Sequence, residues 1–79
     1  MAYLKFMMTD LKTYDVLNPK NIVLGQIVLR DDFKENICYV YYGNKNTFLT
    51  EYSIKEIADM LERLNNKLTN EVFLNNDAF

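Results

Sequence analysis

Three acidic side chains, Asp31, Asp32 and Glu35, lie close together in the stretch RDDFKEN and are the densest group of metal-ligand types in the chain. Carboxylates bind hard cations, but a calcium loop alternates its oxygen ligands and has a glycine at its turn. This stretch has neither feature. We therefore expect a solvated connection between two strands here, and no metal site.

The single cysteine, Cys38, is the other residue that could take part in covalent chemistry. A nucleophilic thiol needs a neighbouring base, and the chain has no histidine. We therefore predict that Cys38 is a small core residue, reduced as in the cytoplasm. The lone glycine of YYGN, Tyr41 to Asn44, fits a tight chain reversal better than a phosphate loop. The residue inventory predicts a protein that is not an enzyme and needs no cofactor.

The length of 79 residues allows one hydrophobic core. We predict a single domain over residues 1–79, with its core in 12–68 and a tail over 69–79. No apolar run is long enough to cross a membrane, and the N-terminus lacks a signal-peptide cleavage motif, so we expect a cytoplasmic protein. The net charge of −2 disfavours binding to nucleic acid.

Alternating or β-branched residues predict three strands, and the N-terminal stretch is either a further strand or the start of a long first strand that bends near Asp10. Asn18 to Asn21 has turn residues, and Asn21 suits a left-handed conformation. Gly25 indicates a bulge or the close approach of another backbone. The four stretches are Tyr3 to Met8, Lys12 to Leu17, Asn21 to Arg30 and Asn36 to Tyr42.

A helix is predicted to begin at Ile54, because Ser53 and Glu56 have the spacing of a capping box. One stripe of this helix is apolar and the other side is polar. The fold class is therefore α+β, with a small antiparallel β-meander of three to four strands packed on one C-terminal amphipathic helix. The apolar stripe consists of Ile54, Ile57, Ala58, Leu61, Leu64 and Leu68.

One helix covers only one face of such a sheet, yet both faces of the last strand are apolar. Tyr39 and Tyr41 point to one side, and Cys38, Val40 and Tyr42 point to the other. The second face needs a cover from the N-terminal segment, the C-terminal tail, a second copy or a foreign partner. Tyrosines are typical of protein-binding surfaces. The predicted partner-binding residues are Phe33, Tyr39, Tyr41, Tyr42 and Asn44.

The motifs KTYDVLN, LGQI, CYVYY, NTF and IKEIADMLERLN follow one another over roughly residues 12–66. In order and spacing they resemble a family of short uncharacterised phage and mobile-element proteins, in which a β-meander leads into one C-terminal helix. The family often has Trp and Arg in the turn before its third strand, where this chain has RDDFKEN, with Phe33 in place of the aromatic residue. The resemblance implies a phage or mobile-element context.

Small phage proteins of this kind commonly bind a host protein and block it. We therefore hypothesise a non-enzymatic inhibitor that forms a homodimer and binds a bacterial host protein such as a defence component. One alternative is a module that sequesters a small nucleotide between tyrosines and the backbone amides near Gly43. Another is nucleic-acid binding, which needs one basic face gathered from Lys5, Lys12, Lys20, Arg30, Lys34 and Lys45.

Overall fold

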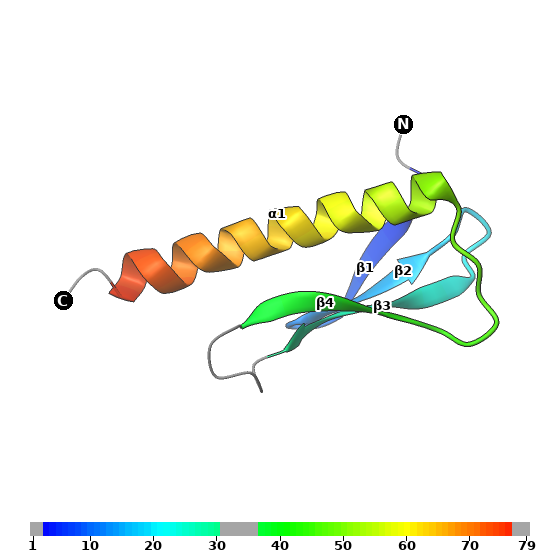
Figure 1. Cartoon of the computed structure of the whole chain (residues 1–79). Helices are drawn as coiled ribbons and strands as arrows, with labels where there is room; N and C mark the ends of the chain where they lie inside the picture. The colour runs from blue at the N-terminus through cyan, green and yellow to red at the C-terminus, as the bar shows by residue number, and fades with distance from the viewer. Residues whose placement is uncertain (1–2, 31–36, 77–79) are drawn as a thin grey trace.

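A computed structural model of the chain describes the backbone of residues 3–30 and 37–76 and the side chains as far as Thr69. Four strands are followed by one helix, which lies over one face of the sheet (Figure 1). This arrangement confirms the predicted α+β fold. The elements are β1 (Lys5–Asp10), β2 (Thr13–Leu17), β3 (Val23–Arg30), β4 (Cys38–Gly43) and α1 (Glu51–Asn76).

The strands form one antiparallel sheet in the order β1-β2-β3-β4, so β1 and β4 are its two edges. The N-terminal stretch is a separate strand, which pairs with β2 across a tight hairpin at Leu11 and Lys12. The segment Asn36 to Tyr42 that was predicted as the third strand therefore corresponds to β4.

The turn between β2 and β3 has the predicted chemistry. The side chain of Asn18 accepts hydrogen bonds from the amides of Lys20 and Ile22, at 2.9 and 3.0 Å. Asn21 has a φ of 65°, the left-handed conformation that asparagine tolerates. This turn fixes the register of the β2–β3 hairpin, because it closes directly onto both strands.

Gly25 combines both predicted features, a bulge and a close backbone approach. The β2–β3 register shifts beside it, so that Val16 faces Gly25 while Leu17 faces Val23, and the extra residue Leu24 is buried in the core. A Cβ atom on Gly25 would lie 2.3 Å from the carbonyl oxygen of Tyr42. Only glycine fits at this position.

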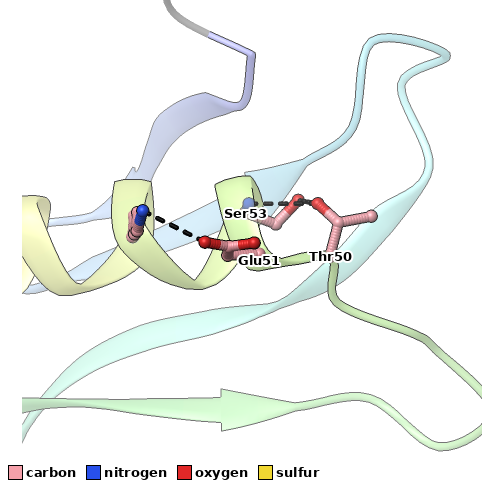
Figure 2. A network of polar contacts seen from close by, with 4 residues as sticks. Thr50, Glu51 and Ser53 are labelled. Carbon is pink, nitrogen blue, oxygen red and sulfur yellow. Dashed lines mark hydrogen bonds and ion pairs between the residues drawn. The ribbon is translucent and has the colours of Figure 1, made fainter.

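The helix begins three residues before the predicted start. Thr50 caps α1, because its Oγ1 accepts from the Ser53 amide at 3.1 Å and lies 3.0 Å from the Ser53 hydroxyl (Figure 2). Glu51 in the first turn pairs with Lys55 at 3.2 Å. The predicted Ser53–Glu56 box is therefore wrong, since Ser53 is the third helical residue and Glu56 binds backbone amides outside the helix.

The core lies between α1 and the sheet, around the fully buried Val16 and Ile27. Ile57, Leu61, Leu64 and Leu68 point inward as predicted, whereas Ile54 and Ala58 are exposed. Residues 69–76, predicted as a tail, continue the helix. These last turns extend past the described strands (Figure 1).

Candidate functional site

Two polar contacts fix the path of α1 across the sheet. Near its start, the Glu56 carboxylate accepts from the backbone amides of Tyr3 and Leu4, at 2.6 and 3.2 Å. Farther along, the Asn65 side chain pairs with the backbone of Tyr39 on β4. The first contact lies beside β1 and the second beside β4, the two opposite edges of the sheet.

The two contacts also lie at opposite ends of the strands. Tyr3 and Leu4 adjoin the sheet end at which Lys5 pairs with Leu17, and Tyr39 lies at the other end, where it pairs with Leu29. The helix therefore crosses the sheet diagonally. One corner on the helix side, at the β1–β2 hairpin, lies beyond its cover.

That corner forms an open groove of about 400 Å³ between the second half of α1 and the hairpin. We call it the hairpin groove. Its volume is within the range of small-ligand pockets in proteins, roughly 300–1,000 Å³. Its lining residues are Met8, Leu11, Lys12, Tyr14, Leu29, Tyr39, Leu64, Lys67 and Leu68.

The hairpin groove is lined by apolar and aromatic side chains and by two lysines. Met8 is 59% exposed and Leu11 is 76% exposed, although both are large apolar residues. The rings of Tyr14 and Tyr39 meet edge to face with their centroids 6.3 Å apart. The charged lining residues are two lysines, one from the hairpin and one from α1. The groove therefore presents solvent-exposed apolar surface beside positive charge.

The face of the sheet opposite α1 is the second candidate surface, and no other described segment lies across it (Figure 1). We call it the open face. The strand register places its side chains in four rows across the sheet. The rows are Lys5, Leu17 and Val23; then Met7, Asp15, Gln26 and Tyr42; then Thr13, Val28 and Val40; then Arg30 and Cys38.

The centre of the open face is aliphatic and its surroundings are polar. Val28 and Val40 are paired neighbours and only half-buried. On one side the Gln26 amide donates to Asp15 at 3.1 Å. Arg30 belongs to the row on the other side of the valines, and its side chain extends past them to donate to the hydroxyl of Tyr42, 5.8 Å from the centre of that ring. Tyr42 remains 45% exposed, so part of its surface is accessible beside the valines.

The predicted partner-binding residues lie in different places. Tyr42 is on the open face, whereas Tyr39 and Tyr41 are on the helix side and pack against the core. Asn44 has a structural role, because its amide donates to Leu24 at 2.9 Å and its side chain donates to Val23 at 3.1 Å. Phe33 lies outside the described residues.

Cys38 differs from its prediction as a core residue. It is half-buried on the open face, opposite Arg30. The carboxylates Asp31, Asp32 and Glu35 lie outside the described residues. Within the described ranges, no group of three or more His, Cys, Asp or Glu side chains is placed to hold a metal ion. Nor does any helix in this part of the chain have the length and apolarity that a membrane span requires.

Tyr41 has the one buried side-chain polar atom without a hydrogen-bond partner in the described part of the chain, its hydroxyl. This hydroxyl lies over Gly25, 2.5 Å from the place where a Cβ atom would be. Burial raises the pKa of Tyr41, because the phenolate is less well solvated there. The absence of a Cβ atom on Gly25 therefore makes room for the Tyr41 hydroxyl, which packs there without a hydrogen bond in the described structure.

The sequence interpretation missed most of the hairpin groove. Lys12 and Lys67 are far apart in the sequence, and no local pattern connects them. The available signal was the apolar pair Met8 and Leu11 around a predicted bend at Asp10, since apolar residues in a hairpin turn lie on the surface unless another element covers them.

The described fold is a four-stranded antiparallel meander followed by one C-terminal helix, an α+β protein with one sheet face uncovered. No family model, no curated protein and no solved structure matches this chain. The open face and the hairpin groove are therefore interpreted from their own chemistry.

Proposed function

We propose that this chain is a non-enzymatic protein of a phage or mobile element that binds a bacterial host protein through the open face and thereby inhibits it. The observation that carries the proposal is the apolar centre formed by Val28 and Val40 beside the exposed ring of Tyr42. A partner that covered this centre would remove apolar area from water.

The open face has the composition of an interface between proteins that exist separately. Such interfaces have an apolar centre, a polar rim, and an enrichment in tyrosine and arginine. Here the rim consists of the Asp15–Gln26 hydrogen bond and of Arg30 against Tyr42. Because these polar side chains already bond to one another in the free protein, they need little rearrangement when a partner binds.

A protein partner suits the described charges better than nucleic acid does. Lys5 lies at one end of the sheet, where its ammonium donates to Asn21, while Lys12 and Arg30 lie at the other end. Among the described residues, these two groups of positive charge do not form one basic stripe along which a phosphate backbone could lie. Asp15 adds a negative charge between them on the open face.

Nucleotide sequestration near Gly43 has less support, because the amide that follows this glycine is already engaged. The Asn44 amide donates to the Leu24 carbonyl, and the Thr47 hydroxyl has the carbonyls of Asn44 and Leu24 as acceptors within reach, at 2.7 and 3.2 Å. These bonds hold the chain reversal against β3. A phosphate-binding turn needs free amides.

The test uses the affinity-tagged full chain to capture proteins from bacterial lysate, with identification by mass spectrometry. Tyr42→Ala and Val40→Lys alter the open face and should each reduce capture of the partner by about tenfold or more. Tyr52→Ala is the matched control, because Tyr52 is a 72% exposed tyrosine on α1. Circular dichroism verifies that each variant is folded.

The proposal is overturned if both open-face variants capture the partner as the unaltered chain does, or if Tyr52→Ala alone abolishes capture. Inhibition is tested by adding the purified protein to the captured partner and measuring the partner's activity, which should fall in proportion to occupancy. Light scattering gives the oligomeric state. If Val40→Lys converts a dimer into a monomer without affecting host capture, the open face binds a second copy and this assignment fails.

A further inference from the structure

We infer that the hairpin groove is a second binding site, for an amphipathic segment of a partner protein in which apolar side chains stand beside carboxylates. The inference rests on the proposed function only in that the segment belongs to a protein. The groove and the open face lie on opposite sides of the sheet, so variants of the two surfaces can be tested separately.

The apolar side chains of the hairpin groove are exposed to solvent. Met8 and Leu11 are more than half exposed, beside the half-buried Leu64 and Leu68 of the helix. These side chains form a concave surface between two elements, which is the shape that accepts the apolar side of a helix or an extended peptide. Met8 has an unbranched side chain, which adapts to differently shaped partners.

The two lysines of the hairpin groove favour a partner segment with carboxylates. Lys12 belongs to the hairpin wall and Lys67 to the helix wall, so each wall offers one lysine to a carboxylate in the groove. The carboxylate of Asp10, at the end of β1, is engaged with the Leu11 amide at 2.7 Å. Because the whole chain has a net charge of −2, any attraction for an acidic peptide must come from this local pair of lysines.

The groove is formed before anything binds, since both of its walls are fixed to the sheet. Asn65 bonds to Tyr39 within one helical turn of Leu64 and Leu68, which holds the helix wall in place. On the hairpin wall, the carbonyl of Lys12 accepts from the Leu29 amide at 3.1 Å. A preformed site loses less conformational entropy on binding than a flexible one.

The experiment uses two short helical peptides as probes, with leucines at the same i, i+3, i+4 and i+7 positions and either glutamate or lysine elsewhere. Binding to the full chain is measured by fluorescence anisotropy at low and high salt. We expect the glutamate peptide to bind at least about fivefold more tightly than the lysine peptide at low salt. This preference should shrink as salt is added, because the two lysines are exposed.

The decisive variant reverses the charge of both walls. In Lys12→Glu with Lys67→Glu the preference should reverse, so that the lysine peptide binds more tightly. The matched control is Lys20→Glu with Lys45→Glu, which changes the net charge equally at exposed positions outside the groove. It should keep the original preference.

Each remaining outcome decides the inference. If the control reverses the preference as fully as the groove variant does, net charge is responsible and no groove site exists. If neither peptide binds, or if light scattering shows a dimer that the groove variant dissociates, the occupant is not a partner's acidic segment. Tyr42→Ala should leave peptide binding unchanged. If the open-face variants do not reduce capture of the host protein while the peptide still binds, only the proposed function is refuted.

Discussion

The side-chain amide of Asn65 pairs at two points with the backbone of Tyr39. Its Oδ1 accepts from the Tyr39 amide at 2.6 Å, and its Nδ2 donates to the Tyr39 carbonyl at 3.2 Å. β4 is an edge strand of the described sheet, so among the described residues one side of it faces no other strand. The Asn65 side chain thus hydrogen-bonds the Tyr39 amide and carbonyl on the edge strand and attaches α1 to the sheet.

Replacing Asn65 should therefore destabilise the protein more than replacing its neighbour. We expect Asn65→Ala to lower the free energy of unfolding by about 1–3 kcal/mol, since two partly buried backbone groups lose their partner. Asn66→Ala is the matched control, because Asn66 is exposed on the same helix and gains the same helix propensity. Urea unfolding followed by circular dichroism measures both. Equal effects would show that the Asn65 pair contributes nothing.

Gly25 and Gly43 face each other across the β3–β4 pair but differ in the space above them. A Cβ atom on Gly25 would lie 2.3 Å from the Tyr42 carbonyl oxygen, whereas on Gly43 its nearest contact would be 3.6 Å from the Tyr41 ring. Gly25→Ala should lower the free energy of unfolding by about 2 kcal/mol or more, because backbone must move. Gly43→Ala should stay within about 1 kcal/mol of the unaltered protein. Thermal unfolding separates them, and a tolerated Gly25→Ala would contradict the close approach.

Local chemistry was enough to predict some of these features. Gly25 lies within a β-branched run, where a glycine indicates a bulge or a close backbone approach. Asn21 follows an Asn-Pro turn, where a left-handed conformation is common. Strand order also followed from the spacing of short turns, since a meander is the simplest antiparallel connection.

The helix start was beyond local chemistry, because Thr50 and Ser53 both have capping residue types. The choice depends on Glu56, which binds amides at Tyr3 and Leu4, more than fifty residues away in the sequence. The hairpin groove depends in turn on the diagonal path that this contact and Asn65 give the helix. Contacts between distant residues decide such features, and no pattern within a short window contains them.

The hydroxyl of Tyr41 is buried without a partner in the described structure, so its removal should cost nothing. We expect Tyr41→Phe to leave the free energy of unfolding unchanged at pH 7 or to raise it by up to about 1 kcal/mol. Tyr52→Phe, which removes an exposed hydroxyl, is the control at that pH. A clear loss in Tyr41→Phe would show that the hydroxyl has a partner.

The same residue gives a pH dependence with a defined sign. Burial raises the pKa of Tyr41 in the folded state above the ordinary value of 10.0. Above pH 10 the unfolded chain therefore releases this proton while the folded chain keeps it, so the free energy of unfolding falls as pH rises. Urea unfolding between pH 8 and 11 should show the unaltered protein losing stability relative to Tyr41→Phe. Parallel curves would contradict the shift.

The contact of Glu56 with the amides of Tyr3 and Leu4 attaches the start of β1 to the first half of the helix. Glu56→Ala removes the acceptor, and Glu62→Ala is the matched control, since Glu62 is an exposed glutamate farther along α1. Hydrogen exchange followed by NMR should show the Tyr3 and Leu4 amides exchanging roughly tenfold faster in Glu56→Ala only, because each loses a charge-assisted bond. If this contact also sets the diagonal path of the helix, the chemical shifts of Leu11 and Leu68 in the hairpin groove should move in the same variant. Faster exchange without movement of those shifts would mean that Asn65 alone determines the groove.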